Sequence, residues 1–484
     1  MKIKLQNIFI AIIILNSSYS LIILPLYNLH QKINISSAYQ LINNFLPNNL
    51  YTVIQGGDPP QNLELIITEE DIIFSIRKHN CLIQKYYYDK TISKSFKNIT
   101  KGKSTVPRFY ESIEAEDSFY FYKSCNDHIN ITDNNIIKVD NFGFVFENEY
   151  KKNYNENNKR YNCAILSLNL FRNNKANNDY NFIIELKKLS VIESHLWTIK
   201  YINNSTKSDD NLEGYLIIGD YPHIYEKDKF NNLNLRSCLN NMQKKGWNLE
   251  FRNITIDNNI ILTHYMEGII SFSISYILGT EEYKSKIATN FFRDLIQKNI
   301  CFEDNINSHY FIYYCKKGEF NETTIKNFPS LNLFHAEFNF TFNFSGNDLF
   351  LEKNGFYYFL IIFDRYNYKT WTFGKIFLNK YQLIFDHSSK KINFYINSEE
   401  KKDIKNEEKK IYINNKILLI VIFSSIAIIS FILGLFIGKR KFKDKKRNKR
   451  ANEMDNEDID YFVNKKESIT DSNDATDISE EGIN

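Results

Sequence analysis

The side chains able to do chemistry form none of the common catalytic signatures in this sequence of 484 residues. Its nine histidines are scattered and include no His-Glu-x-x-His, so we expect no zinc-hydrolase site or other metal centre. No Gly-x-Ser-x-Gly elbow, phosphate-binding loop or Gly-x-Gly-x-x-Gly occurs, which argues against a serine hydrolase and against nucleotide or dinucleotide binding. The sequence therefore predicts no cofactor.

Six cysteines are the remaining reactive side chains, and all of them precede residue 417. They are Cys81, Cys125, Cys163, Cys238, Cys301 and Cys315. An even number favours disulfides if the chain is exported, and no two of them have zinc-finger spacing. Their connectivity stays open at this point. A cysteine nucleophile would require an unpaired member, which an oxidising compartment disfavours.

The N-terminus predicts export. Lys2 and Lys4 give a positively charged start, residues 8–15 are apolar, and Ser18-Tyr19-Ser20 is a small-x-small cleavage site. The apolar stretch is too short to cross a bilayer, so we expect a signal peptide at 1–20 that is cleaved after Ser20.

A second apolar segment, residues 417–438, has the properties of a membrane-spanning helix. It carries no charge and would extend about 33 Å as a helix, enough to cross the hydrocarbon core with a modest tilt. Lys439-Arg440-Lys441 and further basic residues follow at once, which predicts a cytosolic tail at 439–484. A buried core helix is the alternative, and the uncharged length disfavours it. We expect a single-pass membrane protein of the secretory pathway or cell surface, with a lumenal or extracellular ectodomain.

Charge argues against a nucleic-acid partner. The formal net charge is only +4, and much of the positive charge lies just after the predicted membrane helix, so the ectodomain has no basic face. Residues 399–416, with interspersed Lys and Glu, are predicted to form a charged stalk. Residues 453–484 are acidic and polar without apolar periodicity, and they are expected to be disordered.

Nine Asn-x-Ser/Thr sequons lie between the predicted signal peptide and membrane helix, and in an exported chain they are candidate glycan acceptors. They are Asn34, Asn98, Asn130, Asn203, Asn204, Asn253, Asn321, Asn339 and Asn343. Because Asn is abundant in this chain, several of them arise by chance. Modification of both Asn203 and Asn204 is not expected.

The ectodomain pattern predicts a mainly β fold. Short runs of β-branched and aromatic residues are separated by Asn, Asp, Lys or Gly, which is typical of strands joined by turns. The clearest runs are residues 63–67, 215–218, 338–344, 357–363 and 391–396. Only residues 283–298 have the apolar spacing of an amphipathic helix.

Several segments of the first half resemble, in the right order, the pepsin-like aspartic peptidases. Gly57-Asp58-Pro59-Pro60-Gln61 is similar to the family's Gly-Thr-Pro-x-Gln, whose strand leads into the first catalytic loop. Tyr87-Tyr88-Asp89 followed by Ser93-Lys94-Ser95-Phe96 resembles Phe-x-Pro…Ser-Ser-Thr-Phe. Phe142-Gly143-Phe144 and Ala164-Ile165-Leu166-Ser167-Leu168 resemble the Phe-Gly and Gly-Ile-Leu-Gly-Leu segments.

The resemblance continues in the second half. Gly214-Tyr215-Leu216-Ile217-Ile218-Gly219 is similar to the Gly-x-Leu-x-x-Gly strand that closes the first lobe, and Trp247-Asn248-Leu249 resembles the opening of the second. The strongest match is Trp371-Thr372-Phe373-Gly374, with Phe377-Leu378, Tyr381 and Ile384-Phe385-Asp386 after it. It resembles the family's Trp-x-hydrophobic-Gly…Phe…Tyr…Phe-Asp.

The resemblance implies a bilobal pepsin-like fold, with an N-terminal lobe at 50–224 and a C-terminal lobe at 225–398. A short segment, 21–49, precedes the first lobe, and its single basic residue, Lys32, makes it a poor pro-segment for masking carboxylates. Cys301 and Cys315 fall where many members of the family have a second-lobe disulfide.

Both catalytic positions depart from the family. The family uses two Asp residues, one from each lobe in an Asp-Thr/Ser-Gly loop, which share a proton so that one activates water while the other polarises the carbonyl. Here Thr68 takes the first position, followed by Glu69-Glu70, and Ser271 takes the second, followed by Phe272-Ser273. A hydroxyl does not ionise near neutral pH, so it cannot accept a proton from water as a carboxylate does.

A relocated carboxylate pair is the alternative that would keep proteolysis. Glu69, Glu70 and Asp71 adjoin the first loop, and Glu267 precedes the second. A working pair requires two carboxylates that face each other, whereas acidic runs of this kind are typical of solvated turns.

These departures favour an inactive pseudo-peptidase that binds an extended peptide or protein segment in the cleft between its lobes. The alternatives are an active aspartic endopeptidase with a non-standard pair, and a surface or adhesion glycoprotein without a cleft function. The oligomeric state stays open.

Overall fold

The computed structural model describes residues 21–28, 50–69, 74–77, 86, 88–100, 110–124, 135–150, 164–170, 180–202, 212–240, 246–256, 259–262, 265–306, 309–366, 370–396, 424 and 429. Residues 398–484 form a unit apart from 1–397, and only Ser424 and Ile429 of that unit are described. The predicted signal peptide, stalk and cytosolic tail lie outside the described residues. None of the helices among the described residues is long and apolar enough to cross a membrane. Of the predicted membrane span 417–438, only Ser424 and Ile429 are described.

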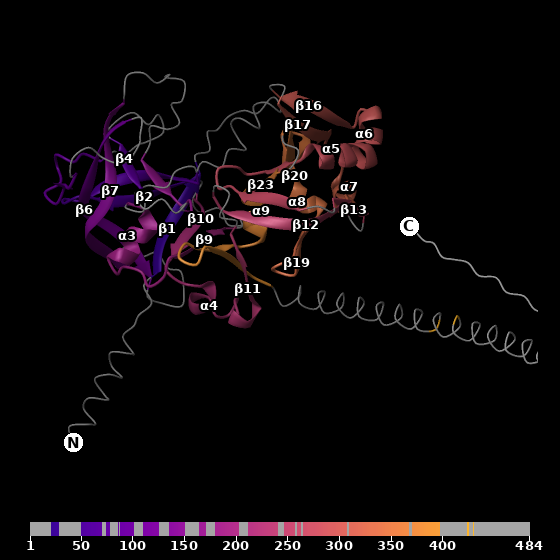
Figure 1. Cartoon of the computed structure of the whole chain (residues 1–484). Coiled ribbons are helices and arrows are strands. Elements are labelled where there is room, and N and C mark those ends of the chain that lie inside the picture. The colour runs from indigo at the N-terminus through magenta and orange to yellow at the C-terminus, as the bar shows by residue number, and fades with distance from the viewer. Residues whose placement is uncertain are drawn as a thin grey trace, which may run out of the picture. The chain divides into compact units, whose positions relative to one another are not determined.

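The first sheet has 13 strands among the described residues (Figure 1). In spatial order they are β11 (Leu235–Leu239), β25 (Lys391–Tyr395), β24 (Ile384–Asp386), β9 (Leu196–Tyr201), β10 (Leu212–Ile218), β1 (Leu21–Asn28), β2 (Leu50–Gly56), β3 (Gln61–Thr68), β8 (Ile165–Ser167), β4 (Ser75–Arg77), β7 (Ile136–Tyr150), β6 (Tyr110–Ser124) and β5 (Lys97–Asn98).

The second sheet has a path of ten strands within the described chain, with β13 and β16 attached at its side. Along the path lie β19 (Phe340–Phe344), β18 (Leu331–His335), β12 (Asn248–Ile256), β14 (Met266–Ile270), β23 (Thr370–Phe373), β15 (Ile277–Gly279), β22 (Ile361–Asp364), β17 (Tyr310–Lys316), β21 (Phe356–Phe359) and β20 (Phe350–Lys353). β13 (Asn259–Leu262) pairs with β12, and β16 (Cys301–Ile306) pairs with β17.

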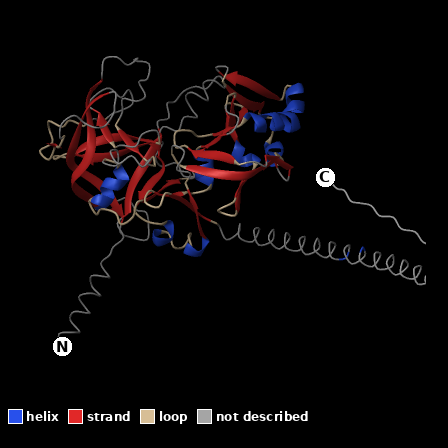
Figure 2. Cartoon of the chain, in the orientation of Figure 1, coloured by secondary structure: helices blue, strands red, loops and turns tan. Residues whose placement is uncertain are grey.

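The helices are short and strands predominate, as Figure 2 shows, so the predicted mainly β class is confirmed. The helices are α3 (Phe182–Lys188), α4 (Pro222–Tyr225), the 3-10 turn η5 (Asn232–Asn234), α5 (Glu281–Ile287), the π-helical turn η6 (Ala288–Phe292), α6 (Arg293–Gln297), α7 (Glu322–Lys326), α8 (Gly346–Leu349) and α9 (Lys375–Lys380). The helix predicted at 283–298 is α5, η6 and α6 in succession, and it begins at Thr280, whose hydroxyl accepts from Tyr283 N.

The strands predicted from the five residue runs are confirmed with two changes. The run 338–344 is a strand only from Phe340 onward, because residues 336–339 form a turn. Residues 63–67 lie in β3, where Leu63, Leu65 and Ile67 are buried in alternation, as expected for a strand with one face on the core. The run 357–363 forms two strands, β21 and β22, because Leu360 between them donates to Leu349 O at 2.7 Å and the chain then changes partners.

The two sheets repeat one local arrangement. In the first, β3 runs parallel to β8, β4 runs parallel to β7, and β4 also meets β8 antiparallel. In the second, β14 runs parallel to β23, β15 runs parallel to β22, and β15 meets β23 antiparallel. This correspondence makes the end of β3 equivalent to the end of β14.

Strands from distant parts of the sequence complete the first sheet. β24 and β25 come from near the end of residues 1–397, yet β24 pairs with β9 and β25 pairs with β11. Figure 1 shows the orange C-terminal strands beside magenta β9. β1, from the segment that precedes the predicted first lobe, is almost wholly buried and pairs with β10, β2 and β6.

Aromatic side chains fill the core of each half. Fully buried Phe74 contacts Phe119, Phe142 and Phe182 with ring centroids 5.4–5.8 Å apart, mostly edge to face. In the second half, Phe292 stacks on Tyr313 at 4.2 Å. Such contacts stabilise by about 0.5–1.5 kcal/mol per pair beyond the burial of their area, so both cores are rigid supports for the loops they carry.

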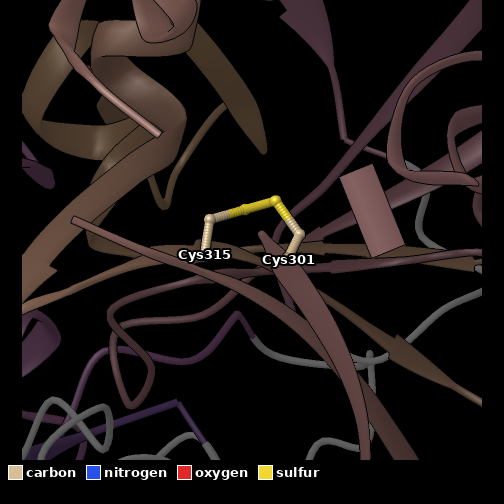
Figure 3. Close-up of a disulfide and its surroundings, with 2 residues drawn as sticks. All are labelled: Cys301 and Cys315. Atoms are coloured by element: carbon tan, nitrogen blue, oxygen red, sulfur yellow. A yellow bond between two sulfur atoms is a disulfide. The ribbon is translucent and has the colours of Figure 1, made fainter. Parts of the chain in front are cut away.

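The disulfide implied by the resemblance is confirmed. Cys301 of β16 and Cys315 of β17 lie directly opposite each other in the antiparallel pair, and their sulfurs are bonded (Figure 3). Cys238 is buried and free, and burial raises the pKa of its thiol, so it behaves as a small apolar side chain. Cys81, Cys125 and Cys163 lie outside the described residues.

Asp117 of β6 organises the Tyr88–Ser95 turn that the resemblance singled out. The Tyr88, Ser93 and Ser95 hydroxyls all donate to its buried carboxylate, and Ser118 N donates at 2.7 Å. Burial, together with this carboxylate, raises the pKa of Tyr88, so the phenol stays protonated and donates.

Asp117→Ala is expected to lower the free energy of unfolding by about 3–5 kcal/mol, because it leaves several buried donors without their acceptor. Chemical denaturation measures the loss. Asp140→Asn is the matched control: Asp140 also accepts a hydroxyl, from Ser118, but its side chain is 60% exposed, so a loss below about 1 kcal/mol is expected. Equal losses in the two variants would show that the cluster around Asp117 is not a structural anchor.

Candidate functional site

Thr68 and Ser271 stand at equivalent ends of two strands, one from each sheet. β3 ends at Thr68, whose carbonyl accepts from Leu168 N at 3.0 Å beside the parallel strand β8. β14 ends at Ile270, and the next residue, Ser271, donates from its N–H to Phe373 O at 3.0 Å beside β23. Both predicted catalytic positions are therefore bonded to the neighbouring parallel strand, Thr68 through its carbonyl and Ser271 through its N–H.

The residues that follow bring the two strand ends together. The Ser271 hydroxyl donates to Glu69 Oε1, and the Ser273 hydroxyl donates to the same oxygen at 2.8 Å. Ser273 N also donates to Ser271 Oγ at 3.3 Å, which orders the second loop. Glu69 Oε2 is buried and makes no hydrogen bond. One carboxylate thus joins the loop of the first sheet to the loop of the second.

The side chain of Phe272 packs the second loop against a buried aromatic cluster. It is fully buried, and its ring lies 5.4 Å from that of Trp197 and 5.8 Å from that of Phe385. Trp247 completes this interlobe aromatic cluster (Trp197, Trp247, Phe272 and Phe385), and its indole N–H donates to Leu168 O at 2.9 Å. The strand-like alternation of Ser271, Phe272 and Ser273 turns two hydroxyls toward Glu69 and the ring toward the cluster.

A glycine is required where the second loop crosses its neighbouring strand. A Cβ on Gly374 would lie 2.3 Å from Ile274 O and 2.5 Å from Tyr276 O, closer than a side chain can approach a carbonyl. This explains the glycine of the Trp371–Gly374 motif, since any other residue would push the loop away from β23. The equivalent place in the first half is held by Ser167, which lies opposite Thr68.

The described part of the site contains one carboxylate, whereas a peptidase dyad needs two. Of the described residues, only Glu69 offers a carboxylate that is hydrogen-bonded to the second loop. Glu70 and Asp71 lie outside the described residues, and Glu267 lies on β14 opposite Glu250, before the strand end. No group of His, Cys, Asp and Glu side chains in the described part of the chain could hold a metal ion. The described residues of the site thus present hydrogen-bonding groups without a second carboxylate that could share a proton with Glu69.

Sequence reasoning weighed Glu69 only as a replacement base. It did not predict the hydrogen bonds from Ser271 and Ser273 to Glu69. Nor did it predict that Phe272 and Trp247 belong to one aromatic cluster. The polar–aromatic–polar order of residues 271–273 was the one local signal, and it cannot identify partners some two hundred residues away.

The described sequons differ in exposure. Asn98, Asn321 and Asn339 are exposed, whereas Asn253 and Asn343 are half-buried. The Asn343 amide donates to Asn332 Oδ1 at 2.5 Å, so a glycan there would break a contact between strands β19 and β18. Asn34, Asn130, Asn203 and Asn204 lie outside the described residues. Glycosylation at every sequon stays a prediction.

Phe272→Ala is expected to lower the free energy of unfolding by about 3–5 kcal/mol, because it removes a fully buried ring from the interlobe aromatic cluster. It should also shift tryptophan emission to longer wavelength, since Trp197 borders the new cavity and Trp247 packs against Trp197. Denaturation and fluorescence spectra measure both effects. Phe96→Ala, at a half-buried ring remote from the cluster, should leave the emission unchanged. An unshifted spectrum in the Phe272 variant would contradict the packing described.

Two buried histidines predict loss of stability in acid. Burial lowers the pKa of His335 to about 4, and burial, with a smaller effect of His195, lowers the pKa of His387 to about 4. As the pH falls, the unfolded chain is protonated at these histidines before the folded protein is. Their contribution to the free energy of unfolding is therefore complete above pH 6.5 and is lost as the pH falls to about 4. Each is worth about 3 kcal/mol. Denaturation at several pH values should show a flatter slope in His335→Gln and His387→Gln, and an unchanged slope would contradict this.

Comparison by sequence places the chain in no established family: no family model and no curated protein matches it. Comparison with solved structures finds basic 7S globulin from soybean, with a TM-score of 0.52 and 14% identity, covering 78% of this chain and 94% of that chain. That protein has a pepsin-like fold. At such low identity the likeness concerns the fold alone, and it agrees with the two repeated sheet arrangements.

Proposed function

We propose that this chain is a membrane-anchored, pepsin-like pseudo-peptidase that binds an extended peptide or protein segment between its lobes without cleaving it. One observation carries the proposal: at the lobe junction the described loop residues present Thr68, Ser271 and Ser273 together with a single carboxylate, that of Glu69. The pepsin-like fold supports the general architecture.

A single carboxylate is poorly suited to the family's reaction. Hydrolysis by a carboxylate pair needs one member to take a proton from water while the other, protonated, polarises the scissile carbonyl. Thr68 and Ser271 cannot exchange protons in this way near neutral pH. Glu69 Oε1 already accepts two hydroxyl hydrogen bonds, and these hold the carboxylate in place.

Peptide binding, unlike peptide hydrolysis, does not require an ionised carboxylate in the site. An extended peptide can be held by strand-like backbone hydrogen bonds, with alternate side chains giving specificity. The proposed partner is therefore an extended protein segment and not a nucleic acid. The acid sensitivity expected from His335 and His387 favours a role near neutral pH, unlike that of a peptidase acting in acid.

The remainder of the proposal concerns topology, and its support is the sequence. A signal peptide at 1–20, a membrane helix at 417–438 and a cytosolic tail at 439–484 would place the two-lobed body on the lumenal or extracellular side. Glycans at exposed sequons such as Asn98 and Asn339 fit that placement.

A working endopeptidase is the second candidate, and the position of Glu69 at the lobe junction is the observation that favours it. Its partner would have to be Glu70 or Asp71, which lie outside the described residues. A surface or adhesion glycoprotein without a cleft function is the third possibility, and the experiment below separates the three.

The full-length protein is expected to leave denatured protein substrates intact from about pH 3 to 7, since a single carboxylate supplies no acid–base pair. It is expected to enrich peptides from a random library, and Glu69→Gln should change that selection. Mass spectrometry of the substrate digest and sequencing of retained peptides measure the two results. Glu267→Gln, on the strand before the second loop, is the matched control and should leave binding unchanged.

Cleavage that a statine-containing inhibitor blocks and Glu69→Gln abolishes would establish the endopeptidase instead. Failure to retain any peptide, with no cleavage, would favour the adhesion glycoprotein.

A further inference from the structure

The second loop of the site is tied to the segment that follows β23. Gly374 N donates to Tyr276 O at 3.1 Å, and Lys375 N donates to Ile274 O at 2.9 Å. Because Gly374 permits this close approach, residues 271–276 and the start of α9 form one hydrogen-bonded unit. A displacement of Lys375 would therefore displace the loop that carries Ser271.

The side chain of Lys375 leaves this unit and crosses to the first sheet. Its ammonium pairs with the Glu213 carboxylate on β10 and lies 5.5 Å from the centre of the Tyr201 ring. Glu213 also accepts from Asn28 Nδ2 of β1 at 3.3 Å. The Glu213 side chain is only 6% exposed and that of Lys375 is 29% exposed, so the pair lies in a largely water-free junction.

Such a pair constrains geometry more than it adds net stability. Desolvation offsets much of the attraction between two buried charges, but removal of one partner leaves the other charge buried and uncompensated. Without Lys375, Glu213 would keep the hydrogen bond from Asn28 but lose the ammonium beside it, and that loss favours entry of water into the junction or movement of the second loop. Either change would act on the contact between Glu69 and the serines.

We propose that Lys375 is a positioning residue for the site: its ion pair with Glu213 holds residues 271–276 at the separation from the first sheet that lets Ser271 and Ser273 reach Glu69. Lys375 does not touch these groups itself. The inference rests on the proposed function only in assigning the residues to a binding site, and its test does not require a ligand.

Hydrogen–deuterium exchange of the full-length protein tests the proposal at the backbone amides of 271–276. Lys375→Met is expected to speed their exchange at least about tenfold, because it removes the ammonium that neutralises a buried carboxylate and so loosens the unit. Lys375→Arg, which keeps the charge, should stay close to the parent protein. Glu213→Gln, which removes the charge and keeps an acceptor for Asn28, should give the same direction of change and replaces Lys375→Met if that variant does not fold.

Lys200→Met is the matched control. Lys200 on β9 pairs with Glu226, the residue that follows α4, and the two side chains are 25% and 11% exposed. Glu226 also lies 3.7 Å from the exposed Lys229, so it keeps a second partner when Lys200 is lost, as Glu213 keeps Asn28. The Lys200–Glu226 pair does not reach the second sheet, so its loss should leave exchange at 271–276 as in the parent. Similar exchange at 271–276 in Lys200→Met and Lys375→Met would overturn the proposal, and so would Lys375→Arg exchanging as fast as Lys375→Met.

A second measurement separates this inference from the proposed function. The exchange rates of Glu69→Gln, Lys375→Met and the double variant should be non-additive, because both residues act on the same loop. Additive effects would overturn the positioning role. Non-additive exchange without any retained peptide would instead overturn the proposed binding function and leave the positioning role standing.

Discussion

A carboxylate that accepts two hydroxyl hydrogen bonds across the junction of two lobes must be held in one place by both of them. Glu69 is in this position, since it belongs to the first strand end and is bonded to Ser271 and Ser273 of the second. The contact requires β3 and β14 to end face to face, which the aromatic cluster around Trp197 and Phe272 supports.

The two halves are alike in backbone and unlike in side chains. The parallel pairing of β3 with β8 is repeated by β14 and β23, so the fold supplies two equivalent strand ends. The residues placed there are Thr68-Glu69 and Ser271-Phe272, and only one of the four can ionise. Among the described residues, the two equivalent strand ends therefore carry an asymmetric polar contact in place of two symmetric acids.

Local patterns predicted local structure well. The alternation in residues 63–67 corresponds to β3, and the apolar spacing of 283–298 corresponds to the α5–α6 helical segment. Both were predictable because the residues on a buried face recur at a regular, short spacing along the sequence. The pairing of β24 with β9, and of β1 with β10, joins residues far apart in the chain, and no periodicity encodes such a choice of partner. The resemblance supplied the Cys301–Cys315 pairing, which spacing alone left open.

The sequence indicated where the two loops of the candidate site lie, but not which contacts their residues make. The order of motifs located Thr68 and Ser271, but the bridge from Glu69 and the Lys375–Glu213 pair depend on how two sheets meet. Neutron diffraction from crystals of the protein, resolving residues 68–73 and 271–273, tests the central claim most directly. The account predicts deuterium on the Ser271 and Ser273 hydroxyls, both directed at Glu69 Oε1, and no second carboxylate within hydrogen-bonding reach of Glu69. A proton shared between Glu69 and another carboxylate would contradict it.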